Sequence, residues 1–258
     1  MITREEDNKR DLVMKPLGYD IRLVIFVTTV IFMAIAILLW NGAGVETPTP
    51  SVPFSTLAFW FFLSLAAETF WLPAFGKRGM VSMSLAANIA VLFVLPRVQA
   101  LSITFSSVLL ADLILHRRGA IRAVFNGAQS SFSLALAGII FDFFIKSSGA
   151  TGSQLLLLCP LAVLITFPVF VLSNSLLVSI AIALEAGKPL GTTWRENYGN
   201  ANHLVSCAVL FLLGLGLILA VETVGFISGF ASLLFIFVIR NAYKYQIRRR
   251  QALPSSAA

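Results

Sequence analysis

The sequence predicts an all-α fold: a polytopic integral membrane bundle of about eight transmembrane helices with both termini in the cytoplasm. Composition is the first observation behind this prediction. Hydrophobic residues make up 58% of the 258 residues and charged residues only 12%, and the mean hydropathy is +0.88. A soluble domain carries roughly 25% charged residues. The second observation is a series of long apolar segments, and the third is the placement of Lys and Arg between them.

Eight apolar segments are candidate spans, because a helix needs about 20 residues to cross ~30 Å of hydrocarbon. Two of them are short for this purpose. A third is long and contains Pro160 and Pro168, where a helix can start or kink. In chain order the predicted spans are Leu23–Trp40, Phe54–Leu72, Met80–Leu95, Val98–Leu115, Ala123–Ile145, Leu155–Leu184, Leu204–Val221 and Val224–Ile239.

Positive charges set the orientation of these spans. Of the 19 lysines and arginines, all but Arg97 and Lys146 fall in clusters on one side, which the positive-inside rule assigns to the cytoplasm. The clusters lie at residues 4–22, 77–78, 117–122, 188–195 and 240–250. An alternative preserves the same charge pattern: residues 80–115 form one re-entrant hairpin with Pro96 and Arg97 at its tip, which leaves six full crossings.

The chain divides into a cytoplasmic N-terminal segment (1–21), a transmembrane helical domain (22–240) and a basic cytoplasmic tail (241–258). Membrane lipids are expected partners, because a basic tail is attracted to an anionic inner leaflet. Nucleic acid is not expected, since the basic residues are split between apolar segments instead of gathered on one surface. Cys159 and Cys207 lie inside apolar segments as small fillers. The sequence therefore predicts no metal, no cofactor and no catalytic residue.

Polar side chains inside the spans are costly in lipid and need a reason. Asp142 and Glu222 fall near outer ends, where water solvates them. A second group comes to a similar depth in the cytoplasmic half of the bundle. One interpretation is a hydrogen-bonded network that fixes helix packing. A second is a ligand or ion pocket that opens inward, and a third is snorkelling to the interface. This predicted polar cluster consists of Glu68, Asp112, Arg122, Asn126, Gln129 and Asn174.

Two local patterns predict further features. Residues 193–196 fit a capping box, which predicts a short helix at the inner interface with Trp194 and Tyr198 on one face. Gly225 and Gly229 form a GxxxG pattern, which favours a helix–helix contact within or between chains.

Three stretches carry a family resemblance that covers roughly residues 60–245. The first runs from Val81-Ser-Met-Ser-Leu-Ala to Val94-Leu-Pro96. The second is Arg122-Ala-Val-Phe-Asn-Gly-Ala-Gln129 with the Ala137-Gly138 step. The third runs from Leu172-Ser-Asn174 through Ala183-Leu-Glu-Ala-Gly-Lys-Pro-Leu190 to Trp194-Arg-Glu-Asn197. Together they resemble the multi-helix N-terminal membrane region ahead of HD-GYP phosphodiesterase or GGDEF cyclase domains in bacterial cyclic-dinucleotide signalling proteins.

The resemblance implies a sensor or anchoring module in the bacterial inner membrane. No catalytic domain follows the last span before Ala258, so the chain is not expected to be an enzyme. Its expected partner is a cytoplasmic signalling protein or a second copy of itself. The alternative is a small-molecule transporter, or the substrate-binding membrane subunit of one. A membrane enzyme would need acid–base residues at the interface, for which Glu68, Asp112 and His116 are the candidates.

Overall fold

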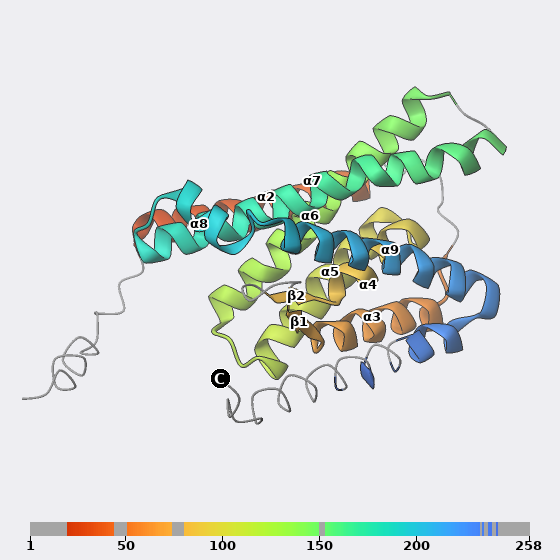
Figure 1. Ribbon diagram of the computed structural model, residues 1–258, viewed down its shortest axis with the longest axis horizontal. Coiled ribbons are helices and arrows are strands. Elements are labelled where there is room, and N and C mark those ends of the chain that lie inside the picture. The colour runs from red at the N-terminus through yellow and green to blue at the C-terminus, as the bar shows by residue number, and fades with distance from the viewer. Residues whose placement is uncertain are drawn as a thin grey trace, which may run out of the picture.

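Helices account for nearly all of the described chain (Figure 1). The computed structural model describes residues 20–43, 51–73, 80–149, 153–232, 234, 237, 238 and 241. The helices are α2 (Ile21–Ala43), α3 (Phe54–Glu68), α4 (Ser84–Val94), α5 (Arg97–Leu110) with the π-helical turn η1 (Ala111–Leu115), α6 (Ala120–Ser147), α7 (Ser153–Ala186), α8 (Leu190–Asn197) and α9 (Ala201–Val224). The helical fold class is confirmed for these residues. The predicted N-terminal segment and basic tail lie almost entirely outside them.

Five helices in the described ranges are long and apolar enough to cross a membrane, judged by length and composition. They are α2, α5 with η1, α6, the later part of α7, and α9. α7 is continuous over 34 residues, so neither Pro160 nor Pro168 interrupts it. α3 and α4 are apolar but have 15 and 11 residues, or about 22 and 16 Å at 1.5 Å per residue. Residues 226–232 continue as helix after α9, so the predicted eighth span is described in part. The count of eight stays a prediction.

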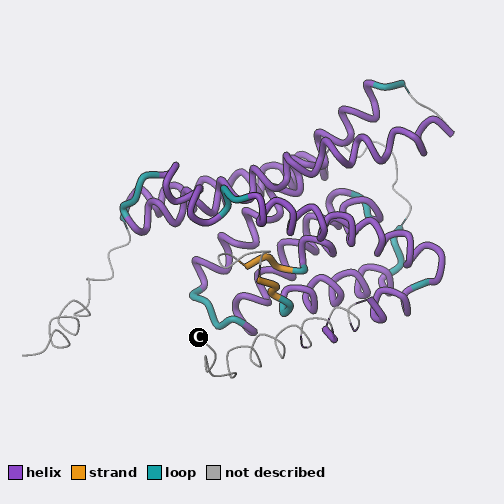
Figure 2. The backbone as a smooth tube through the Cα atoms, viewed as in Figure 1, coloured by secondary structure: helices purple, strands orange, loops and turns teal. Residues whose placement is uncertain are grey.

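A short strand pair corrects the predicted boundaries of the second and third spans. α3 ends at Glu68, and Trp71–Pro73 (β1) pairs antiparallel with Met80–Ser82 (β2), as the orange segments of Figure 2 show. Pro73 lacks the amide hydrogen that a continuing helix needs, and strand pairing satisfies backbone groups that would otherwise be left open. The pairing brings Ser82 beside the C-terminal end of α3, which matters for the site described below.

The bundle is apolar on its outer surface and carries polar side chains inside. α6 packs against both α5 and α7 and also contacts α2, while α4 packs against α9. Figure 1 shows α2 and α7 along one edge and α3 along the opposite edge, with α4, α5 and α9 between them and α6 crossing the bundle obliquely. Large apolar side chains such as Phe32 and Leu212 are more than 60% exposed, whereas Ser64, Thr104 and Ser133 are completely buried. This inside-out distribution fits a protein whose outer solvent is lipid.

Basic residues gather toward one end of the bundle. Arg22 and Lys188 line one recess between the start of α2 and the end of α7, and Arg122 forms an ion pair near the same end of α7. Arg97 instead pairs with Asp142 at 2.9 Å. Asp142 lies twenty residues beyond Arg122 on α6, or about 30 Å along the helix axis. The described residues therefore separate Arg97 from the basic clusters, as the charge pattern predicts.

The short helix α8 is present, but its predicted start is wrong. Pro189 occupies its N-cap position, so Thr193 lies within the helix and its hydroxyl donates to the Pro189 carbonyl at 3.1 Å. Pro189 fixes its own φ at a helix-compatible value, which starts the helix three residues before the expected capping box. Trp194 lies on the face toward α7, where its Nε1–H donates to the Ser175 hydroxyl at 3.2 Å.

The predicted GxxxG pattern does not form one helix face, because Gly225 caps α9 and, of the two glycines, Gly229 alone makes a close contact within the chain. Gly225 ends α9 with φ +91°, a backbone conformation that side-chain-bearing residues rarely adopt. The helical segment after it lies against α3, and the Phe226 and Phe230 rings lie 4.5 and 5.3 Å from the Phe59 ring, centroid to centroid. A Cβ on Gly229 would come within 2.5 Å of the Phe59 ring, so the close approach requires a glycine.

Candidate functional site

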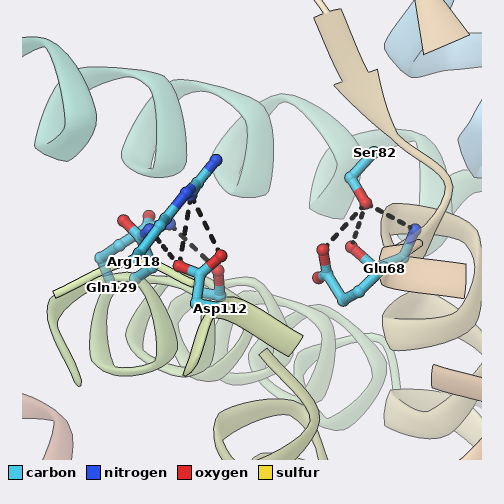
Figure 3. A network of polar contacts seen from close by, with 8 residues as sticks. Glu68, Ser82, Asp112, Arg118 and Gln129 are labelled. Atoms are coloured by element: carbon cyan, nitrogen blue, oxygen red, sulfur yellow. Dashed lines mark hydrogen bonds and ion pairs between the residues drawn. The ribbon is translucent and has the colours of Figure 1, made fainter. Parts of the chain in front are cut away.

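A polar cavity of about 300 Å³ lies inside the bundle, at the end where the basic residues gather. Its walls come from the end of α3, the start of α4, η1, the first half of α6, the second half of α7 and the α8–α9 region. Figure 3 shows two polar groups in it, one around Glu68 and Ser82 and the other around Asp112, Arg118 and Gln129. The polar lining residues are Glu68, Ser82, Ser84, Asn88, Asp112, Arg118, Asn126, Gln129, Ser130, Asn174, Ser175, Tyr198, His203 and Cys207.

The first polar group is built by the strand pair. Glu68, the last residue of α3, is 6% exposed, and the Ser82 hydroxyl donates to its Oε2 at 3.0 Å. The backbone N–H of Ser84 donates to the Ser82 oxygen at 3.1 Å, and the two serine hydroxyls lie 2.9 Å apart. In the part of the chain that the structure describes, no Lys, Arg or His forms an ion pair with Glu68. Among the described residues, the hydrogen bond to its carboxylate therefore comes from a neutral donor.

The second polar group is built around η1. Asp112 is 3% exposed, and the Arg118 guanidinium lies 3.1 and 3.2 Å from its two carboxylate oxygens. The Asn126 amide also donates to Asp112. Arg117 has φ +52°, and the chain turns back after it so that the Arg118 N–H reaches the Asp112 carbonyl at 2.8 Å. With 37% of its side chain exposed, Arg118 connects buried Asp112 to the surface.

The structure removes one residue from the predicted polar cluster. Arg122 was expected beside Asp112, but it pairs with Glu185 of α7 outside the cavity, and both side chains are at least half exposed. The physical reason is its position in the first turn of α6, from which it reaches the end of α7. Arg118 takes the place expected for Arg122. The other five predicted residues, Glu68, Asp112, Asn126, Gln129 and Asn174, all line the cavity.

Two side-chain atoms of lining residues are buried without a hydrogen-bond partner among the described residues. Gln129 is 5% exposed, and its Oε1 is one of them, although its Nε2 donates to Ser130 at 3.0 Å. His203 is 6% exposed, with Nε2 3.4 Å from the Cys207 sulfur and Nδ1 unpaired. Such atoms cost free energy unless something hydrogen-bonds to them.

Tyr198 supplies a donor at the α8–α9 turn. Its ring packs edge-on against His203, with centroids 5.0 Å apart. Burial raises the pKa of Tyr198 to about 12. The hydroxyl therefore stays protonated at physiological pH and remains available to donate.

Several lining residues escaped the sequence reasoning. Ser82 and Ser84 fall inside the predicted span Met80–Leu95, whereas the structure places Ser82 in β2 and Ser84 at the start of α4. Asn88 of the same predicted span accepts from Thr104 of α5 at 3.4 Å and also lines the cavity. His203 directly precedes the predicted span Leu204–Val221, where no sequence pattern marks it as a site residue.

The titratable side chains in the cavity form no metal-ligating group among the described residues. Within the described ranges, no three His, Cys, Asp or Glu side chains lie close enough to hold a metal ion. The comparisons with known proteins do not narrow the assignment: no protein-family model, no curated protein and no solved structure matches this chain. The function must be argued from the cavity itself.

Proposed function

We propose that this protein is a ligand-sensing module of a bacterial inner membrane. A small polar molecule occupies the cavity, and its binding biases the packing of the surrounding helices for a cytoplasmic partner or a second copy. The observation that carries the proposal is the polar cavity of about 300 Å³ inside an apolar bundle. Polar groups inside a membrane protein are expensive and mark ligand or ion sites, and this volume is at the lower end of ligand pockets.

The position of the cavity supports a link to the cytoplasm. Its wall includes Arg118 in the η1–α6 turn and Tyr198 after α8, both in the connections that the positive-inside rule places in the cytoplasm. A ligand that contacts Asp112 and Asn174 touches α7 together with the π-helical end of α5. Because π-helical turns recur at functional sites, η1 is the element that we expect to change on binding. The resemblance to membrane regions of cyclic-dinucleotide signalling proteins supports the same role.

The proposal includes eight crossings with both termini in the cytoplasm. The α4–α5 connection bears on the choice between eight crossings and a re-entrant hairpin. Arg97, the first residue of α5, pairs with Asp142, about 30 Å along α6 from Arg122. This distance is close to the hydrocarbon thickness, which supports a crossing by α5 with η1. α4 is about 16 Å long and is short for a second crossing.

A transporter, or the substrate-binding membrane subunit of one, is the second candidate function. The observation that favours it is the same cavity next to an irregular helix end, η1, since broken helices line the substrate sites of many transporters. Flux of a bound molecule into proteoliposomes would assign the protein to this class, and binding without flux would assign it to the sensors.

The experiment that tests ligand binding analyses what co-purifies with the protein. We expect mass spectrometry of the detergent-purified protein to detect a small polar molecule that Asn174→Leu reduces by about tenfold or more, because the leucine removes a polar contact and fills the cavity. Asn202→Leu is the matched control, since Asn202 is an exposed residue of α9 outside the cavity. If no molecule co-purifies and no polar metabolite in a thermal-shift library stabilises the wild type, the proposal fails.

A further inference from the structure

We infer that the cavity takes a small organic ammonium ion, with the carboxylate of Glu68 as its counter-ion. This inference rests on the proposed function and names the class of ligand. It follows from the charge balance of the lining residues, from their unused hydrogen-bonding capacity and from the shape of the apolar wall.

Among the described lining residues, one carboxylate forms no ion pair with a cation. Asp112 is satisfied by the Arg118 guanidinium and the Asn126 amide. Glu68 receives the neutral Ser82 hydroxyl, and within the described ranges it has no ion pair. A buried carboxylate is stabilised far more by a cation than by a hydroxyl. An ammonium group would supply that cation.

The unused hydrogen-bonding capacity of the lining residues also favours an ammonium ligand. Two lining residues have a buried side-chain atom without a hydrogen-bond partner among the described residues, Gln129 Oε1, which is an acceptor, and His203 Nδ1. His203 Nδ1 accepts when Nε2 carries the proton toward Cys207. An ammonium or a hydroxyl-bearing ammonium brings donors for these atoms. A carboxylate or phosphate ligand would bring acceptors instead, would face Glu68, and would find Arg118 already engaged by Asp112.

The remaining wall suits a short hydrocarbon chain. Leu85, Val108, Phe170, Val171 and Val178 line the cavity between the polar groups, and burying CH₂ groups against them is favourable. The volume of about 300 Å³ accommodates a chain of several carbons. An amino alcohol of this length matches both features.

The test compares three probes of equal length on the full-length protein in detergent. They are 5-amino-1-pentanol, 1,5-pentanediol and 5-hydroxypentanoate, which differ in the charge of one end group. Thermal unfolding and calorimetric titration at constant ionic strength measure binding. We expect the amino alcohol to bind at least about tenfold more tightly than the diol or the hydroxy acid. Glu68→Gln should weaken amino alcohol binding by about tenfold or more, whereas Glu222→Gln, an exposed carboxylate on α9, should not.

Each other outcome overturns the inference. Equal binding of all three probes would show that charge plays no part, and stabilisation by sodium ions alone would indicate an inorganic cation site. Absence of amino alcohol binding would contradict the inference directly. If the diol or hydroxy acid binds at least as tightly as the amino alcohol, in a manner that Asn174→Leu abolishes, the ammonium inference fails and the proposed function stands. If the co-purification and library experiments also detect nothing, both fail together.

Discussion

At the scale of single residues, two arginines four positions apart in the sequence, Arg118 and Arg122, have opposite environments. Arg118 reaches back to a carboxylate that is 4% exposed, whereas Arg122 meets a carboxylate that is half exposed. The sequence places both in one basic cluster and offers no means to rank them. What separates them is the backbone between η1 and α6, where Arg117 has a positive φ and directs Arg118 toward the interior.

The first prediction tests this difference. Arg118→Gln should lower the free energy of unfolding by about 1–3 kcal/mol, because it leaves Asp112 buried without its cation. In a double-mutant cycle with Asp112→Asn, the loss should be less than additive by about 0.5–3 kcal/mol. Denaturant unfolding in mixed micelles measures both quantities. Arg122→Gln is the control and should change stability by no more than about 1 kcal/mol, since its ion pair is exposed. Strict additivity would contradict the pairing.

At the scale of elements, hydropathy predicts which segments are helical and local chemistry decides where they end. The predicted spans for α2, α6, α7 and α9 lie within two or three residues of the observed helices, because long apolar segments in lipid have no alternative to a helix. The strand pair and the π-helical turn were not predicted. They depend on tertiary contacts, such as Ser82 with Glu68, that no local pattern encodes.

The residues of the candidate site also divide into those that the sequence predicts and those that it does not. Five cavity residues were found from depth alone, because counting residues along a helix gives the height of a side chain in the membrane. The same counting suggested Arg122, which has a suitable height but faces outward to Glu185. Ser82 and Tyr198 lie in connections between helices, where depth counting has no meaning, so only the structure could place them.

The second prediction belongs to the packing of α9 on α4. A Cβ on Gly214 would lie 2.7 Å from the backbone oxygen of Ala86, whereas a Cβ on Gly216 would meet nothing within 4 Å. Gly214→Ala should therefore destabilise the protein by about 1–3 kcal/mol, because two helix backbones must move apart. Gly216→Ala should be neutral or stabilising by up to about 1 kcal/mol. Thermal unfolding of the two variants side by side measures the contrast. Equal effects would contradict the close approach of α9 and α4.

At the scale of the whole molecule, charge and polarity are organised along one axis. The basic clusters that are described, and the cavity, lie at one end, while Arg97 and Asp142 lie toward the other. The outer surface is apolar along the helices between these ends. This arrangement is what the positive-inside rule predicts when the cavity end faces the cytoplasm.

The third prediction tests this orientation. In a background with Cys159 and Cys207 replaced by alanine, Gly119→Cys and Ser147→Cys place one thiol at each end of α6. A membrane-impermeant maleimide should label position 147 in intact cells, and position 119 only after the membrane is opened. Both positions are exposed, so burial does not limit the reaction. Labelling of position 119 from outside intact cells would reverse the proposed topology and with it the cytoplasmic access to the cavity.

The Arg97–Asp142 ion pair bears on whether a solute in the cavity can cross the bundle. α6 contributes Asn126, Gln129 and Ser130 to the cavity wall, and beyond them Leu134 and Ala137 are completely buried in the core before Asp142 meets Arg97. On α6, buried apolar side chains therefore separate the cavity from the Arg97–Asp142 ion pair. A solute that passed along α6 from the cavity to the opposite end would have to displace these side chains and break that ion pair.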